Sequence, residues 1–310
     1  MTRGNASLQA ARANKNDEFF TRLSDIETEL PHYREHFKGR TVYCNCDCPE
    51  TSNFWRFFAA HFEDYGLKRL IATFKGPHAY QAEMRHSGGV LTETRHRLLQ
   101  GGAFQSPECV QYLRQADIIA TNPPFSLWRE YLSLLTAHQK KFVIIGPLHA
   151  ITYKTVFPLL QGGELWLGNS AVRAFLTPGG DVQKFGNIFW YTNLDRPQRH
   201  IPLPLSCRYS PELYPKYANY DAIEVGRVSQ LPGDYDGAMG VPVSFLRRHC
   251  PAQFEILGLS STLAAAIPEG LPKHLRGGIR FYLKDQDGSC RRMYERLVIR
   301  RIQPKTATIS

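Results

Sequence analysis

Short apolar runs and helically spaced apolar positions follow one another along residues 24–192. Runs of strand character fall at residues 41–46, 70–74, 117–121, 141–146, 164–168 and 187–192. Helical periodicity accompanies them at residues 24–37, 50–65 and 127–137. Strands that alternate with helices predict an α/β fold around a mostly parallel sheet, with right-handed crossovers between neighbouring parallel strands.

Local signals refine these elements. Ser24 and Ser126 stand where N-caps are expected, so each is predicted to begin a helix. Residues 75–103 show no clear period, which predicts an inserted or mobile loop near the ligand-binding edge of the sheet. The proline-rich residues 194–215 are expected to connect to a smaller lobe.

The most informative stretch is residues 117–125, which read Asp-Ile-Ile-Ala-Thr-Asn-Pro-Pro-Phe. The apolar run stops at Asn122, and Pro123 and Pro124 follow with fixed φ and no N–H group. Phe125 comes next. An amide side chain, a proline carbonyl and an aromatic face therefore gather at the carboxyl end of a strand, the edge where open α/β sheets bind ligands.

This set suits methylation of a planar exocyclic nitrogen, which is a poor nucleophile because its lone pair is delocalised. Asn122 Oδ1 and the Pro123 carbonyl would accept hydrogen bonds from its two N–H groups and favour a pyramidal nitrogen facing a methyl sulfonium. Phe125 would stack on the planar group and hold it in line. The structural alternative is a strand-to-helix turn with proline at the first helical positions.

Composition narrows the class of protein. The 310 residues, 43% apolar, can form one large domain or a domain with a lobe. Their longest apolar runs are too short to span a bilayer. Residues 1–16 are polar, lack the apolar core of a secretion signal and are expected to form a flexible arm. An odd count of seven cysteines then predicts reduced thiols in the cytoplasm.

Three of these cysteines alternate at Cys44, Cys46 and Cys48, so the strand pattern places them on one face. They are interpreted as small buried side chains. Zinc is the alternative, but no CxxC pair or second cluster accompanies them, and no metal is predicted. The chain also lacks the Pro-Cys dipeptide expected of cytosine C5 methylation.

Positive charge is concentrated near the C-terminus. The formal net charge is +10, and residues 273–310 hold ten Lys and Arg against three Asp and Glu. Apolar residues are interleaved there, which favours a folded basic strand or helix over a loose tail. Such a surface suits a polyphosphate partner, and the alternative is a solubilising surface. The arginine quartet predicted to touch DNA is Arg291, Arg292, Arg300 and Arg301.

Several motifs resemble the EcoRI-type adenine-specific DNA methyltransferase family, and the likeness covers roughly residues 15–300. Besides Asn-Pro-Pro-Phe, the matching segments are Lys-Asn-Asp-Glu-Phe-Phe-Thr at residues 15–21, Val-Tyr-Cys-Asn-Cys-Asp at 42–47, and the stretch from 234 through 258. The resemblance implies a class I S-adenosylmethionine-dependent methyltransferase, Rossmann-like, with an antiparallel edge strand in its mostly parallel sheet. It also implies a smaller C-terminal region for DNA recognition.

The resemblance further implies two groups of cofactor contacts. Asn45, Cys46 and Asp47 would contact the methionine portion of S-adenosylmethionine, with Asp47 accepting from its ammonium group. The segment that folds over the cofactor would be Phe19, Phe20 and Thr21. Two departures stand out. The turn after the first strand contains no glycine, and no carboxylate follows the second strand to hold the ribose. Capping of the next helix is the alternative role for Asp47.

The leading hypothesis is a DNA adenine-N6 methyltransferase that flips its target adenine out of the duplex. The expected organisation is a flexible arm at 1–16, a catalytic domain at 17–195 and a basic target-recognition region at 196–310. Double-stranded DNA is the expected partner, with no membrane association and a monomeric, cytoplasmic protein from a prokaryote or phage, typical of restriction–modification. The alternatives are methylation of RNA adenine or protein glutamine, and a non-catalytic DNA-binding relative.

Overall fold

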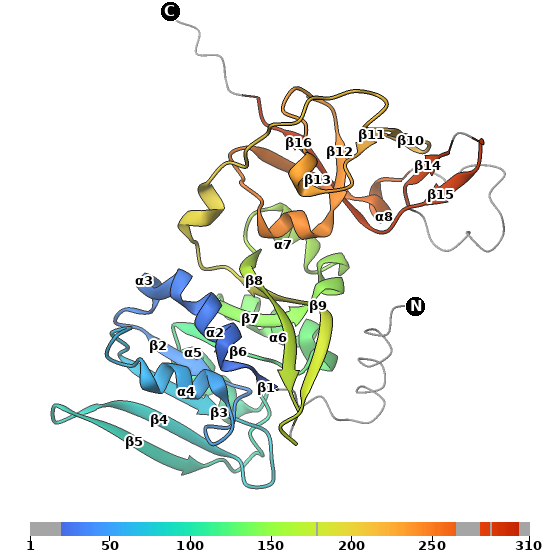
Figure 1. The fold of residues 1–310 in the computed structure, drawn as a ribbon. Helices are drawn as coiled ribbons and strands as arrows, with labels where there is room; N and C mark the ends of the chain where they lie inside the picture. Colours follow the sequence, from blue (N-terminus) through green and yellow to red (C-terminus); the bar gives the residue numbers. More distant parts are fainter. Residues whose placement is uncertain (1–19, 178, 265–279, 286, 304–310) are drawn as a thin grey trace, which may run out of the picture. The chain divides into compact units, whose positions relative to one another are not determined.

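The computed structural model describes residues 20–177, 179–264, 280–285 and 287–303. The predicted arm at residues 1–16 lies outside them. The chain divides into two compact units, Met1–Arg196 and Pro197–Ser310 (Figure 1). In the described ranges, no helix is both long and apolar enough to cross a membrane.

A nine-stranded sheet forms the core of the first unit, in the order β1-β8-β9-β7-β6-β2-β3-β4-β5. Its centre is parallel and consists of β3 (Arg69–Thr73), β2 (Thr41–Cys44), β6 (Ile118–Thr121) and β7 (Lys141–Pro147). These strands are almost wholly buried, as expected for parallel strands covered on both faces. The predicted α/β class with a mostly parallel sheet is confirmed.

Antiparallel strands extend this sheet on both sides, beyond the single edge strand that was expected. One side carries β9 (Val182–Thr192), β8 (Trp166–Leu176) and β1 (Phe20–Thr21). The other side carries β4 (Tyr80–Ser87) and β5 (Val90–Arg97).

Four of the described helices of this unit fall in the three predicted ranges, and those at residues 107–115 and 157–161 were not predicted. The described helices are α2 (Leu23–Glu29), α3 (Arg34–Phe37), α4 (Asn53–Ala60), α5 (Pro107–Gln115), α6 (Trp128–Ala137) and α7 (Phe157–Gln161). In Figure 1, α4 lies in front of the sheet and α6 behind it.

Both predicted N-caps are wrong. The N-cap of α2 is Arg22, whose guanidinium donates to Asp25 at 3.0 Å, and a short 3-10 turn beginning at Phe125 delays α6 until Trp128. Ser24 and Ser126 therefore fall inside helical turns.

The prediction of an irregular loop at residues 75–103 is also wrong, because β4 and β5 form a hairpin there. Their register pairs Ser87 with Val90 across a two-residue turn. Gly88 and Gly89 fill that turn with φ of +59° and +82°, the left-handed conformation that tight hairpins require. The pattern was hidden because nearly all of β5 is exposed at the sheet edge, so its residues carry no apolar alternation. The glycine pair was the available signal.

The second unit contains a seven-stranded sheet in the order β13-β16-β12-β11-β10-β14-β15. Its strands are β10 (Lys216–Tyr217), β11 (Tyr220–Glu224), β12 (Met239–Pro242), β13 (Phe254–Leu259), β14 (Tyr282–Lys284), β15 (Cys290–Arg292) and β16 (Arg296–Arg301). A short helix, α8 (Ser260–Leu263), follows β13.

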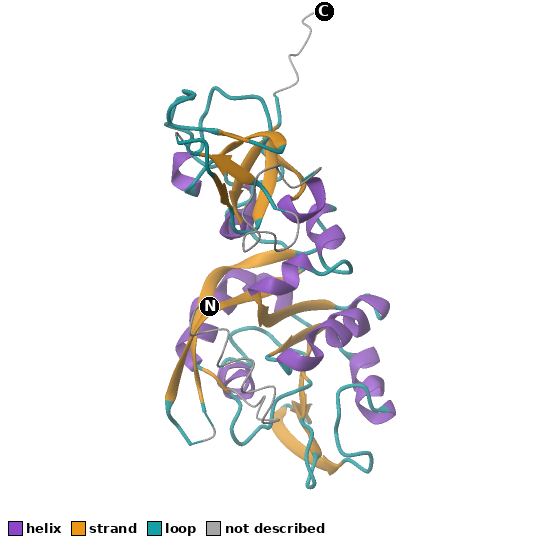
Figure 2. Cartoon of the chain, turned by 90° about the vertical axis from the view of Figure 1, so that its right-hand side faces the viewer, coloured by secondary structure: helices purple, strands orange, loops and turns teal. Residues whose placement is uncertain are grey.

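Strand β16 lies inside this sheet between β12 and β13, and Leu297, Val298 and Ile299 are fully buried. The prediction that the basic C-terminal stretch folds as a strand or helix, and is not a loose tail, is confirmed for this segment. Figure 2 shows how strands and loops dominate this unit, while most helices belong to the first.

Candidate active site

Two polar turns meet at one edge of the first sheet. Strands β2 and β6 are parallel neighbours, with Val42 opposite Ile118 and Tyr43 opposite Ile119. Their carboxyl ends therefore point the same way, and the turn that begins at Asn45 lies beside the turn that begins at Asn122. This placement follows from the pairing of parallel strands and puts both turns at the sheet edge where such folds bind ligands.

A buried carboxylate joins the two turns. Asp47, 7% exposed, accepts a hydrogen bond from Ser52 Oγ at 2.6 Å and another from the hydroxyl of Thr121. Thr121 is the last residue of β6 and directly precedes Asn122. The backbone N–H of Asp47 also donates to the Thr73 carbonyl at 3.0 Å, which ties the turn to β3.

The electrostatic state of Asp47 follows from its burial. Loss of hydration raises the pKa of Asp47 to about 6, and the hydrogen bonds from Ser52 and Thr121 oppose part of that rise. No cation accompanies the carboxylate in any described ion pair. A positively charged ligand placed beside Asp47 would stabilise its ionised form.

Asp47 does not cap the next helix. Ser52 is the N-cap of α4, and its Oγ accepts from the N–H groups of Phe54 and Trp55 at 3.0 and 3.3 Å. The alternative role considered for Asp47 is therefore wrong, and the glycine-free turn is held by Asp47 and Ser52 together.

Asn45 lies on the floor of the same turn and is 1% exposed. Its Oδ1 accepts a hydrogen bond from the hydroxyl of Tyr131 on α6. Phe104 meets the Tyr131 ring edge-on, with 5.0 Å between ring centroids. The Nδ2 atom of Asn45 is buried and donates to no group in the described part of the chain.

Strand β1 is anchored to this turn from the other side. Asn53 Nδ2 donates to the Thr21 carbonyl at 2.8 Å, and Phe20 and Thr21 pair with Leu176 and Phe175 of β8. The Thr21 hydroxyl is buried and has no hydrogen-bond partner within the described ranges. Phe19, the third residue predicted in this segment, lies outside the described residues.

The turn after β6 combines polar and aromatic groups. Asn122 and Pro124 are half-buried, Pro123 is buried, and the Oδ1 atom of Asn122 is itself inaccessible to solvent. Phe125 is 7% exposed and meets Phe175 edge-on, with 6.0 Å between ring centroids. Its ring is thereby held at a fixed angle.

Of the three neighbouring cysteines, Cys44 is buried, and Cys46 and Cys48 are partly exposed. Strand β2 ends at Cys44, so Cys46 and Cys48 follow in the turn and do not continue the predicted one-sided pattern. Desolvation raises the pKa of the Cys46 thiol well above its usual range, and the neighbouring Asp47 carboxylate adds to the rise. The described residues contain no group of three or more His, Cys, Asp or Glu arranged to hold a metal ion.

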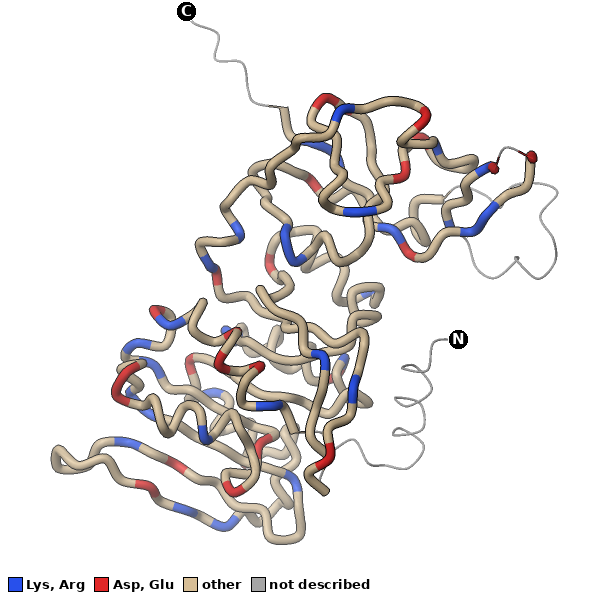
Figure 3. Tube along the Cα trace, viewed as in Figure 1, with Lys and Arg blue, Asp and Glu red and all other residues tan. Residues whose placement is uncertain are grey.

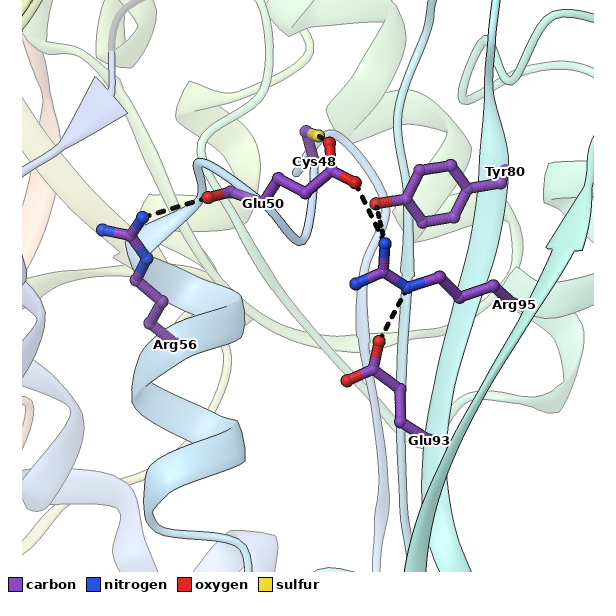
Figure 4. Close-up of polar contacts among 6 residues, drawn as sticks. All are labelled: Cys48, Glu50, Arg56, Tyr80, Glu93 and Arg95. Carbon is purple, nitrogen blue, oxygen red and sulfur yellow. Dashed lines mark hydrogen bonds and ion pairs between the residues drawn. The ribbon is translucent and has the colours of Figure 1, made fainter.

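Glu50 extends the polar turn toward the β4–β5 hairpin. Its carboxylate accepts from Arg95 of β5 at 3.0 Å, and its carbonyl accepts from Arg56 of α4 at 3.0 Å (Figure 4). Arg95 also bonds Glu93 at 2.9 Å and lies over the Tyr80 ring, 5.1 Å from its centroid. Nothing in the sequence pattern indicated this link.

The arginine quartet belongs to the second unit and is largely engaged with carboxylates. Arg300 contacts Glu255 at 2.5 Å and Arg301 contacts Asp236 at 2.6 Å. The Arg291 guanidinium lies 3.7 Å from Asp285. Figure 3 shows acidic positions interspersed among the basic ones of this unit. The local excess of positive charge is therefore partly neutralised within the fold.

Sequence reasoning missed Ser52, Thr121 and Tyr131, which hold the polar turns in place. A Ser just before the phenylalanine-rich helix was a readable N-cap signal. Thr121 and Tyr131 offered none, because a Thr in a strand and a Tyr in a helix have ordinary packing roles.

The fold and the paired turns define this protein as an α/β methyltransferase of class I architecture. The family model described as adenine-specific methyltransferase EcoRI matches residues 7–302, and the chain belongs to that family.

Curated relatives agree with this assignment. The Type II methyltransferase M.EcoRI of Escherichia coli is 39% identical over 289 residues, covering 82% of this chain and 89% of that protein. M.MgeORF184P of Mycoplasma genitalium is 36% identical over 269 residues, covering 80% and 84%. M.MpnI of Mycoplasma pneumoniae is 36% identical over 268 residues, covering 80% and 83%. The recognised family resemblance is confirmed.

Proposed function

We propose that this chain transfers a methyl group from S-adenosylmethionine to N6 of an adenine in DNA. The observation that carries the proposal is the hydrogen bond from Thr121 to Asp47. It joins the predicted cofactor turn to the strand that ends in Asn-Pro-Pro-Phe, so the methyl donor and the acceptor amine would meet at one edge of the sheet. Membership of the adenine-specific family and the relatives named Type II methyltransferases support the same reaction.

The residues present fit the methionine end of the cofactor. That end carries a carboxylate, an ammonium and a sulfonium, and the turn offers two buried polar atoms without protein partners in the described residues, Asn45 Nδ2 and Thr21 Oγ1. Asn45 would donate to the cofactor carboxylate and Asp47 would accept from the ammonium. When bound, S-adenosylmethionine supplies an electrophilic methyl group on its sulfonium sulfur.

The turn after β6 would prepare the adenine. Oxygen acceptors on Asn122 and Pro123 would orient the two N–H groups of N6, and Phe125 would stack on the purine ring. The base must first leave the duplex, since its amino group is out of reach of this turn while stacked. No carboxylate or imidazole belongs to the Asn122–Phe125 turn, so the released proton would pass to solvent.

The decisive experiment expresses the protein in cells that lack DNA adenine methylation and sequences their DNA for N6-methyladenine. We expect methylation at a defined sequence, and none with the Asn122→Ala variant. Loss of one preorganised acceptor at the reacting nitrogen should lower turnover by about 10²–10³, while S-adenosylmethionine binding stays near normal. Turnover near that of the wild type in the purified variant would contradict the role given to Asn122. Methylation of RNA alone would contradict the DNA substrate.

A further inference from the structure

A concavity of about 480 Å³ opens at the base of the β4–β5 hairpin. Its lining comes from the start of β4 and the end of β5, which face each other in register with Tyr80 opposite Arg97. The lining residues are His78, Ala79, Tyr80, Arg95 and Arg97.

This concavity lies one strand away from the candidate active site. Asp47 N–H donates to Thr73 O, and Thr73 pairs with Gln81, the residue after Tyr80. The base of the hairpin therefore shares the sheet edge on which the polar turns converge. The opposite end of the hairpin, at Gly88 and Gly89, points away from that edge.

The two arginines of the lining differ in their partners. Arg95 bonds both Glu50 and Glu93, so two carboxylates compensate its single charge (Figure 4). Arg97 is exposed and forms no ion pair with any described residue, and the same holds for Lys75 in the connection that leads to β4. An uncompensated guanidinium beside an aromatic ring and an imidazole favours an anionic ligand.

Two other roles for these charges are separated by the test below. Charged side chains often protect an open sheet edge from pairing with other strands, and Arg97 lies on the edge strand β5. Arg85 and His86 on β4 are already paired, with Glu83 at 3.3 Å and Glu63 at 2.8 Å. The adenosine half of the cofactor could also occupy the concavity, but it carries no negative charge that would match Arg97.

We propose that this concavity binds a backbone phosphate of the DNA substrate, with Arg97 as its principal cation. The inference rests on the proposed function and adds a DNA contact in the catalytic unit, separate from the arginine quartet. Phosphate contacts of this kind fix the register of a protein on DNA without reading bases. The contact would hold the strand close to the edge where the flipped adenine must enter.

The test compares Arg97→Gln, Arg97→Lys and a control, Arg85→Gln at the far end of the hairpin. Binding of a short fluorescein-labelled duplex of mixed sequence is measured by anisotropy across a series of salt concentrations. Losing one phosphate contact should flatten the log–log salt slope by about 0.9 in Arg97→Gln. Affinity at low salt should fall roughly tenfold, and equally on unrelated sequences. Arg97→Lys should keep the slope, and Arg85→Gln should match the wild type.

Calorimetry of S-adenosylmethionine on the same variants completes the test, and its affinity should not change. A drop in that affinity with an unchanged salt slope would assign the concavity to the cofactor and overturn the proposal. An unchanged slope and unchanged cofactor affinity would overturn it in favour of edge protection. Failure of the proposed function is distinguishable, because it would appear as absent methylation by the wild-type protein, whatever Arg97 does.

Discussion

Replacing Thr121 with Val removes the hydroxyl that links Asp47 to the strand before Asn122, and it does so without changing side-chain shape. Thr121 is fully buried, so no water replaces the lost donor. A hydrogen bond to a charged group contributes about 1.5–3 kcal/mol, whereas a neutral one contributes about 0.5–1.5 kcal/mol. The destabilisation should therefore depend on whether Asp47 is ionised.

The pH window follows from the direction of the shift. Burial raises the folded-state pKa of Asp47 to about 6, from an ordinary value of 3.8. A carboxyl whose pKa is raised by folding lowers the free energy of unfolding once the pH passes its unfolded-state pKa. The full loss is reached above its folded-state pKa. Two units correspond to about 3 kcal/mol. Thr121→Val raises the folded pKa further, so the added cost begins near pH 6 and grows above it.

The measurement is urea unfolding of both proteins at about pH 5 and about pH 8, with the free energy of unfolding extrapolated to water. We expect Thr121→Val to lose about 1 kcal/mol at the lower pH and about 2–3 kcal/mol at the higher pH. Thr73→Val is the matched control on the neighbouring strand β3. Its hydroxyl is 2.6 Å from the Tyr43 hydroxyl, whose pKa burial holds well above the ordinary value.

The control should lose the same free energy at both pH values, because the Tyr43 hydroxyl stays protonated at both. Equal losses for Thr121→Val at the two pH values would refute the charged state assigned to Asp47. The same refutation follows if Thr73→Val shows an equal dependence on pH.

Three further outcomes are expected. Asp47→Asn should weaken S-adenosylmethionine binding in calorimetry. Only the wild type should gain cofactor affinity as pH rises through about 6, because the cofactor ammonium favours ionised Asp47. A wild-type affinity that does not change with pH would argue against that contact. Phe125→Leu should reduce the fluorescence change of 2-aminopurine at the target base, since stacking contributes about 1–3 kcal/mol; an unchanged signal would make Phe125 purely structural. Exchanging the arginine quartet for Gln should lower DNA affinity on all sequences alike. The log–log salt slope of DNA binding should flatten by less than about 0.9 per arginine, because at least three of them already face carboxylates. An unchanged affinity and slope would mean that this region is a solubilising surface.

The sequence by itself determined the fold class and the position of the turn that we propose binds the adenine. Each parallel strand is a short, almost wholly buried run, and β2 and β6 are each followed directly by an asparagine. Both signals are local, so they do not depend on the tertiary arrangement. The same is true of Asn122 through Phe125, whose meaning depends on residue types in direct succession.

Tertiary structure alone decided how the site is held together. Thr121 and Asp47 are separated by 74 residues, and Tyr131 and Asn45 by 86, so no local pattern records their contact. Those hydrogen bonds exist because β2 and β6 became parallel neighbours. The hairpin that brings Arg95 to Glu50 was likewise invisible to hydrophobic patterning, since an exposed edge strand needs no apolar face. The glycine-free turn after β2 is held by side chains from three separate segments, and only the folded sheet places them within hydrogen-bonding distance.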